Sequence, residues 1–243
     1  VCGGAASGKT TLLNCLSNFI RPEAKIVTIE DTPELQLYHG NWVQSVTRSS
    51  VGPSSSGEIT LFDLLRAAMR QRPEYVVVGE VRGAEAYTLF QAMSTGHLGM
   101  ATLHAESVRA AIHRLESEPM NIPRTLIAGL NMITVQTRVE KEGRPVRRTV
   151  TTTEIVGIEP KTNDIITNEV YRWDAREDDY HFTGRCRLLE TLSVKTGLSI
   201  KEIWEAVEER KTVLDWMVKE GRRGFREVTE TIRTYYADSK QAL

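Results

Sequence analysis

A run of small residues near the start of the chain ends in one lysine and two threonines, a composition typical of a phosphate-binding loop. Residues 3–10, GGAASGKT, fit the pattern GxxxxGK followed by Ser or Thr, in which glycines let successive backbone N–H groups point at phosphate oxygens. A helix beginning near Lys9 adds the positive end of its dipole. Lys9 is expected to reach the β- and γ-phosphates of a nucleotide, and the Thr10 hydroxyl to take a Mg²⁺ coordination position. The predicted nucleotide-binding residues are Gly4, Ala5, Ala6, Ser7, Gly8, Lys9, Thr10 and Thr11.

Two groups of acidic residues stand at the ends of apolar strands. Nucleotide hydrolysis requires a carboxylate that orients the attacking water or holds a Mg²⁺-bound one. The predicted strand Tyr75–Val78 runs into Gly79 and Glu80, where a Walker B carboxylate belongs, with Gly at the usual Asp position. Glu30 and Asp31 end a second apolar strand. Ligand sites in open α/β sheets lie at the carboxyl ends of strands, so both groups are expected to converge on the nucleotide. We predict Glu80 and Glu30 as catalytic acids, Glu80 also as a Mg²⁺ ligand through water, and Asp31 as a supporting residue.

Two histidines flank the next predicted strand, residues 99–103. His104 follows its carboxyl end, on the side where the ligand is expected, and an imidazole there can donate to the γ-phosphate. We predict His104 as a catalytic residue and His97 as a supporting one, with a purely structural role as the alternative for His97.

These side chains belong to a chain in which helix and strand patterns alternate. Such alternation predicts an α/β fold with a mainly parallel sheet and crossover helices. A Gly/Ser/Pro loop is predicted at 49–57, and Thr60 with Asp63 provides the capping signals of the helix that follows. The predicted helices are 9–19, 61–71 and 84–94, and the predicted strands are 25–29, 75–78 and 99–103.

From about residue 134 to 184 the apolar pattern changes to a period of two. Residues 149–158 and 165–173 predict an antiparallel hairpin around a polar turn. Residues 138–148 form a local basic strip. After Arg185 the pattern is helical, with a capping box at Ser199 and Glu202 and a last helix at 225–236. We therefore predict an ATPase-type core over 1–184, with a hairpin extension from about 138, and a helical region over 185–243.

The composition is that of an ordinary globular protein. The 243 residues are 40% hydrophobic and 26% charged, and 31 Lys and Arg face 32 Asp and Glu, for a net charge of −1. This balance excludes disordered and collagen-like classes, and it gives no overall basic field for nucleic acid. No run reaches about 18 consecutive apolar residues, so no transmembrane helix is predicted.

Four motifs in this order resemble the type II/type IV secretion ATPase superfamily. After the phosphate-binding loop come an acidic box, IEDTPELQL at 29–37, the atypical Walker B segment VVVGEVRG at 76–83, and a histidine box, STGHLGMATLHA at 94–105. The tracts at 62–105 and 119–131 resemble the archaeal branch in particular, which includes secretion, pilus-assembly and archaellum motor ATPases. The resemblance covers the chain from Val1 to about Trp173.

The resemblance implies a RecA-like P-loop fold and a Mg²⁺-dependent ATPase. Such an enzyme is a homohexamer at the cytoplasmic, inner face of the cell membrane, where it drives pilus-like filaments through a polytopic membrane platform protein. Pilin-like or archaellin subunits are then indirect partners, and no nucleic acid is expected. Arg48 and Arg82 match family arginines and are predicted as supporting residues, although a surface salt bridge explains Arg48 equally well. The family also has a domain before the P-loop that supplies arginines, so we expect this chain to be the C-terminal ATPase portion, with its start truncated.

Other functions stay open at this point. A RecA-like nucleic-acid motor, such as a conjugation ATPase, would need the basic strip at 138–148 to contact DNA; the net charge and the lack of interleaved aromatic residues oppose it. The full set of acids opposes a nucleotide-sensing scaffold. No NKxD base-reading motif occurs, which disfavours a GTPase.

Overall fold

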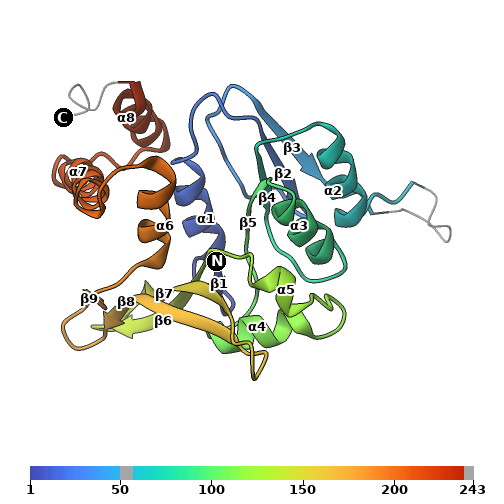
Figure 1. Ribbon diagram of the computed structural model, residues 1–243. Coiled ribbons are helices and arrows are strands. Elements are labelled where there is room, and N and C mark those ends of the chain that lie inside the picture. The colour runs from blue at the N-terminus through green and yellow to red at the C-terminus, as the bar shows by residue number, and fades with distance from the viewer. Residues whose placement is uncertain (50–56, 238–243) are drawn as a thin grey trace.

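Four short strands form a parallel sheet at the centre of the molecule, in the order β3–β2–β4–β5 (Figure 1). The computed structural model describes residues 1–49 and 57–237 of the chain. All three strand pairings in this sheet are parallel, so the carboxyl ends of its strands lie at one edge. The strands are β2 (Ile26–Glu30), β3 (Trp42–Val46), β4 (Tyr75–Val78) and β5 (Leu98–Ala101).

The strand that carries the phosphate-binding loop, β1 (Cys2–Gly3), lies beside the end of β5. Cys2 forms a parallel bridge with Leu103, two residues beyond β5, and the Leu103 N–H donates to the Val1 carbonyl at 2.9 Å. On its other side β1 pairs in parallel with β6 (Met132–Lys141). The loop after β1 therefore emerges at the same edge as the loops after β2, β4 and β5.

The central strands are buried on both faces, which produces three layers. Val77 of β4 packs with Leu13 of α1 on one face. Its neighbours Val76 and Val78 point to the other face and join the core that includes Leu65 of α2, as the two-residue period of a strand requires. The helices are α1 (Lys9–Ser17), α2 (Leu61–Arg70) and α3 (Glu85–Ser94), with the predicted Thr60–Asp63 capping box at the start of α2.

Antiparallel strands extend the structure beyond β1, in the order β1–β6–β7–β8–β9. The predicted hairpin at 149–158 and 165–173 is confirmed as the pairing of β7 with β8, and β6 with β7 forms a second hairpin before it. Two helices, α4 (Val108–Glu116) and α5 (Arg124–Ile127), connect the parallel sheet to β6. The remaining strands are β7 (Arg144–Ile158), β8 (Ile165–Asp174) and β9 (Asp179–Phe182).

Three helices complete the described chain and lie on the α1 side of the sheet (Figure 1). The last one, α8, contacts the end of α1, where the Thr229 hydroxyl donates to Asn18 Oδ1 at 3.1 Å and the Tyr236 hydroxyl to the Phe19 carbonyl at 2.6 Å. The predicted Ser199 cap is present at the start of α7. These helices are α6 (Arg187–Thr196), α7 (Ile200–Lys219) and α8 (Phe225–Ala237).

The fold class predicted from the sequence is confirmed: a parallel α/β core, antiparallel strands beside it and helices at the end. The division of the chain at residue 184 stays a prediction. Among the described residues, no helix combines the length and the apolar character needed to cross a bilayer.

A buried carboxylate joins the antiparallel strands to the C-terminal helices. Glu154 of β7 is 2% exposed and accepts hydrogen bonds from the backbone N–H groups of Arg187 at 2.8 Å and Leu188 at 2.9 Å, and from Asn168 Nδ2 at 2.7 Å. Burial alone raises the pKa of Glu154, but these hydrogen bonds together outweigh it and hold the pKa below its ordinary value of 4.5. Glu154 therefore stabilises the start of α6 as an anion.

We expect the Glu154→Gln variant to lower the free energy of unfolding by about 1–3 kcal/mol at pH 7, because the amide presents an N–H₂ group to donors. The folded-state pKa of Glu154 is lowered, so its contribution is complete above about pH 4.5 and is lost as the pH falls through that folded-state pKa. Urea unfolding at pH 7 and pH 3.5 should thus show a smaller difference between wild type and variant at the lower pH. The exposed Glu205, on α7, provides the control as Glu205→Gln. A difference that is equal at both pH values would contradict the role of the anion.

Candidate functional site

The phosphate-binding loop is packed tightly against itself and against β6. A Cβ atom on Gly3 would lie 2.4 Å from Ser7 Oγ and 2.5 Å from the Gln136 carbonyl oxygen, so only glycine fits there. Gly8, with a φ of 92°, takes the left-handed conformation that glycine adopts at low cost. Lys9 Nζ and Ser7 Oγ both donate to the Gly4 carbonyl at 2.9 Å. The lysine thus lies folded across the loop.

The groups around this loop fit a polyphosphate. Gly8 is the N-cap of α1 and has no side chain that could accept a hydrogen bond, so no cap side chain competes with an anion for the first-turn N–H groups of α1. Lys9 supplies a cation, and Thr10, in the first turn, supplies the hydroxyl that a hard cation such as Mg²⁺ prefers. Ala5, Ala6 and Thr11 are exposed on the same loop and helix end. All eight predicted nucleotide-binding residues are therefore in one continuous cradle.

Glu30, predicted as a catalytic acid, is buried at the end of β2 and is 2% exposed. Its Oε1 atom accepts from the backbone N–H groups of Glu34 at 2.9 Å and Leu35 at 2.8 Å, and its Oε2 atom accepts from Gln44 Nε2 at 3.3 Å. The carboxylate thereby fixes the loop of the acidic box. A Cβ atom on Gly79 would lie 3.1 Å from Glu30 Cγ, so Glu30 fills the space next to the position where a Walker B aspartate is usual.

Glu80 lies beyond the end of β4 and is exposed, in contrast to Glu30. Beside it, Arg82 forms an ion pair with Asp31, which also accepts from Thr47 Oγ1 at 3.1 Å. This pair connects the loops that follow β2 and β4. The structure therefore brings all four of these predicted residues to the edge where the phosphate-binding loop emerges.

The two predicted histidines lie at opposite ends of β5. His104 follows Leu103, the partner of Cys2, and is exposed beside the start of the phosphate-binding loop. His97 precedes β5, its Nδ1 atom lies 3.2 Å from the Ala92 carbonyl at the end of α3, and it faces an apolar cavity of about 630 Å³. The structure thus brings His104, and not His97, to the phosphate-binding loop.

Arg48 lies just after β3, the strand farthest from β1 in the parallel sheet. Its Nε atom donates to the Gly57 carbonyl at 2.7 Å, and its backbone pairs with Ile59. Within the described chain, Arg48 therefore joins Gly57 and Ile59 to the end of β3, across the parallel sheet from the phosphate-binding loop.

Sequence reasoning missed Glu106, which lies beside the phosphate-binding loop. Glu106 Oε1 lies 3.4 Å from the position of a Cβ atom on Gly4. The signal was present, because Glu106 follows His104 at the end of a strand that was already predicted to point at the site.

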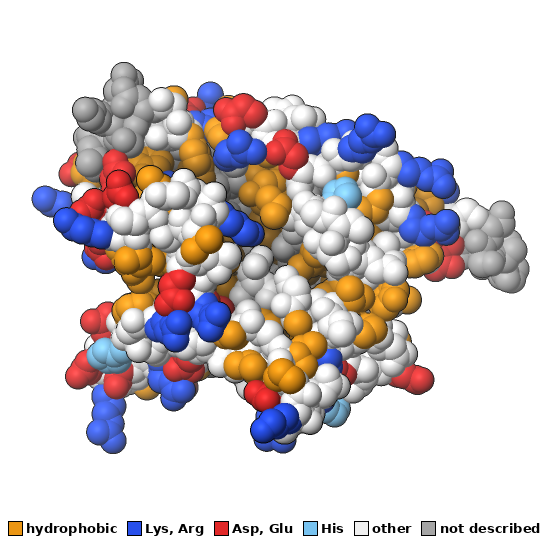
Figure 2. All heavy atoms as spheres, in the orientation of Figure 1, with side chains coloured by type: hydrophobic (Ala, Val, Ile, Leu, Met, Phe, Trp, Pro, Cys, Tyr) orange, Lys and Arg blue, Asp and Glu red, His pale blue; other side chains and the backbone are white. Residues whose placement is uncertain are grey.

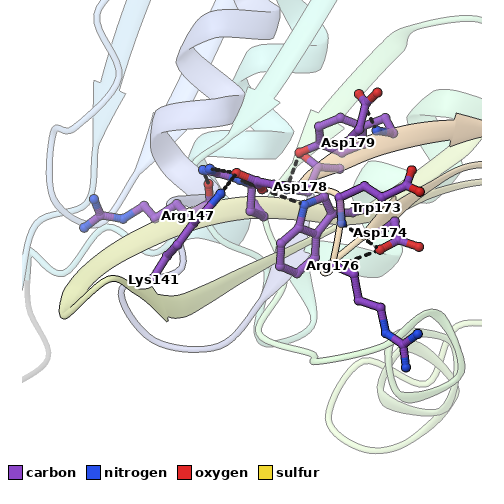
Figure 3. Close-up of polar contacts among 11 residues, drawn as sticks. Lys141, Arg147, Trp173, Asp174, Arg176, Asp178 and Asp179 are labelled. Atoms are coloured by element: carbon purple, nitrogen blue, oxygen red, sulfur yellow. Dashed lines mark hydrogen bonds and ion pairs between the residues drawn. The ribbon is translucent and has the colours of Figure 1, made fainter.

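The basic strip at 138–148 covers the end of β6 and the start of β7. Asp178, in the turn between β8 and β9, accepts hydrogen bonds from Lys141 Nζ at 2.6 Å, from Arg148 Nε at 2.7 Å and from Trp173 Nε1 at 3.0 Å (Figure 3). Arg148 first, then Lys141 and Trp173, hold the pKa of Asp178 far below its ordinary range. Part of the strip is therefore neutralised within the protein itself.

Arg147, from the same strip, contacts the phosphate-binding loop. Its Nε atom donates to the Ala6 carbonyl at 3.1 Å, and its Cδ atom lies 2.8 Å from the position of a Cβ atom on Gly8. No sequence pattern indicates this contact, because the two partners are 141 positions apart.

Comparison with known proteins places this geometry in a family. The family model described as "Type II/IV secretion system protein" matches residues 1–241. The chain belongs to this family. The resemblance stated from the four motifs is thereby confirmed, and the four motifs are those that supply the site.

Relatives of this secretion system protein extend to archaea and bacteria. "Uncharacterized protein MJ1287" of Methanocaldococcus jannaschii is 49% identical over 235 residues, 97% of this chain and 86% of that protein. The "Putative conjugal transfer protein MT3759" of Mycobacterium tuberculosis is 43% identical over 118 residues, 48% of this chain and 33% of that protein. The relative from Methanocaldococcus is consistent with the archaeal branch.

Among solved structures, the VirB11 ATPase from the Brucella suis type IV secretion system, in complex with sulphate, is similar with a TM-score of 0.52 and 27% identity. The match covers 62% of this chain and 46% of that one. The aligned part of this chain thus spans about half the length of the VirB11 chain.

Proposed function

We propose that this secretion system protein is a Mg²⁺-dependent ATPase whose hydrolysis cycle powers the assembly or secretion of pilus-like filaments. The observation that carries the proposal is that the phosphate-binding loop, His104 and the acids Glu80 and Glu30 emerge at one edge of a parallel sheet, in a chain of this family. The proposed working form is a homohexamer at the cytoplasmic, inner face of the cell membrane. Its proposed partner is a polytopic platform protein, through which it acts indirectly on pilin-like or archaellin subunits.

The residues take distinct roles in this proposal. Lys9 and the N–H groups of residues 4–11 hold the phosphates, and Lys9 exchanges the Gly4 carbonyl for phosphate oxygens. Thr10, and Glu80 through a water, would hold Mg²⁺, which would supply positive charge against the phosphate oxygens. Glu80, exposed to solvent, accepts the proton of the attacking water. His104 donates to the γ-phosphate.

The second acid and the arginines support this arrangement. Glu30 keeps the acidic-box loop in place from its buried position. The ion pair between Asp31 and Arg82 joins that loop to the Walker B segment, so Glu30 and Glu80 stand on two segments that are linked to each other. Arg48 is proposed as a supporting residue that holds Gly57 on the same edge of the sheet.

We expect the purified protein to release phosphate from ATP in Mg²⁺ buffer. Activity should disappear in excess EDTA and return when Mg²⁺ is added in excess of the chelator, because removal of the cation leaves the phosphate charge uncompensated. Phosphate release and the binding of a fluorescent ATP analogue are the measurements. Full hydrolysis in EDTA would contradict the metal requirement, and a wild-type protein that binds no nucleotide would contradict the function.

A RecA-like nucleic-acid motor is the second candidate, and the similarity to a putative conjugal transfer protein favours it. The structure provides an argument against it, since Lys141 and Arg148 are bound to Asp178 and Arg147 contacts the phosphate-binding loop. Figure 2 shows acidic and basic side chains interspersed over the C-terminal helices, without a continuous basic stripe on that face. Stimulation of ATP hydrolysis by single- or double-stranded DNA would favour the nucleic-acid motor.

A further inference from the structure

Two neighbouring arginines of β7 point to opposite faces of the antiparallel sheet. Successive side chains of a strand alternate between faces. Arg148 donates to Asp178, whereas Arg147 donates to Ala6 of the phosphate-binding loop. Figure 3 shows the Arg147 side chain extending away from Asp178. The contact of Arg147 with the loop is thus not part of the ion-pair cluster.

Arg147 binds the loop at a peptide whose orientation matters. In a planar trans peptide the carbonyl oxygen and the following N–H point in opposite directions. The Ala6 carbonyl points out to Arg147 Nε, so the N–H of Ser7 points into the loop, where it donates to the Gly4 carbonyl at an N···O distance of 3.4 Å. That N–H is one of the groups that an anion in the cradle would use.

The same peptide is held in an unfavourable backbone conformation. Ala6 has a φ of 57°, in the left-handed region that residues other than glycine, asparagine and aspartate rarely adopt. The hydrogen bond from Arg147 and the packing of its side chain over Gly8 both favour this conformation. In the described part of the chain Arg147 forms no ion pair, so its Nε donor is committed to the loop instead of to an acid.

We propose that Arg147 is a positioning residue of the phosphate-binding loop, which keeps the Ser7 N–H directed at the polyphosphate of a bound nucleotide. The inference rests on the proposed function, because it assumes that the cradle takes a nucleotide. It assigns to the β6–β7 hairpin a direct part in nucleotide affinity. If the basic strip at 138–148 contributed only surface charge, Arg147 would have no effect on nucleotide affinity.

The test compares Arg147→Ala and Arg147→Lys with Arg144→Ala. Arg144 is exposed, lies on the same strand and points to the face of Arg148, so its variant removes the same charge without touching the loop. Titration with a fluorescent ATP analogue, kcat and KM for ATP, and thermal unfolding with and without ADP are the measurements. Arg147→Lys keeps the aliphatic stem over Gly8 and guards against a variant that fails to fold.

We expect Arg147→Ala to weaken nucleotide affinity by about 10- to 100-fold, as the loss of a hydrogen bond from a charged donor predicts. KM for ATP should rise by a similar factor while kcat at saturation changes by less than about threefold, and the unfolding temperature without nucleotide should stay near that of wild type. Arg147→Lys should recover part of the affinity, and Arg144→Ala should bind like wild type.

The outcomes separate this inference from the function on which it rests. A wild-type protein that binds no nucleotide would refute the function. A wild-type protein that binds nucleotide, beside an Arg147→Ala variant with the same affinity, would refute the role of Arg147 alone. Equal losses in Arg147→Ala and Arg144→Ala would assign the effect to net charge and would also overturn the proposal.

Discussion

Replacement of Lys9 by alanine is expected to remove nucleotide binding by this secretion system protein. Lys9 is the only cation within the motif, and its ammonium group already lies across the cradle, 2.9 Å from the Gly4 carbonyl. Hydrogen bonds to charged groups contribute about 1.5–3 kcal/mol each, and contacts to two phosphates together correspond to about 10²- to 10⁴-fold in affinity. A fluorescent-ATP titration measures the loss directly.

The control for this variant is Lys201→Ala. Lys201 is an exposed lysine of α7 that pairs only with Glu205 in the described chain, so its removal changes the net charge equally. The Lys9→Ala protein should unfold at a temperature close to that of wild type, because the lysine side chain that is removed makes a single hydrogen bond to the loop. Unchanged nucleotide affinity in Lys9→Ala would rule out residues 3–10 as the phosphate-binding loop.

Glu80→Gln should stop turnover while ATP remains bound. The amide keeps the shape of the side chain and loses its basicity, and a positioned base contributes about 10²- to 10⁴-fold to a rate. Since Glu80 is exposed and outside any strand, we expect no change in thermal unfolding. Single-turnover phosphate release, with affinity measured in parallel, separates the chemical step from binding.

Glu30→Gln provides the matched comparison, because the two acids occupy different environments. Glu30 accepts backbone N–H groups in a buried position, so an amide there leaves a donor unpaired and should lower the free energy of unfolding by about 1–3 kcal/mol. Near-wild-type turnover in Glu80→Gln together with lost turnover in a folded Glu30→Gln would exchange the roles of the two acids.

The sequence was sufficient to predict those elements whose burial requires a continuous run of apolar residues. β4 is uninterrupted valine at Val76, Val77 and Val78 because both faces of the strand are covered. By contrast β3 was not predicted, since as an edge strand it includes the polar Gln44 and Ser45 and is only partly buried. Its role as the outer support of Glu30 follows only from the pairing of β2 with β3.

The positions of the site residues were predictable and their environments were not. Strand ends place Glu30, Glu80 and His104 at one edge of the sheet, a consequence of parallel topology. That Glu30 is buried depends on the turn after it, which directs the N–H groups of Glu34 and Leu35 back to its carboxylate. The contact between Arg147 and Ala6 depends on a strand register set far along the chain.

The contact of α8 with α1 has a consequence for the order in which the protein matures. The two hydrogen bonds at the end of α1 join residues 211 and 217 positions apart. At a ribosomal rate of about 5–20 residues per second, synthesis of the chain from the end of α1 to its contacts in α8 takes about 10–40 s. The helix that follows the phosphate-binding loop therefore gains this support only after α8 has been synthesised, so the nucleotide site is completed late relative to its own place in the chain.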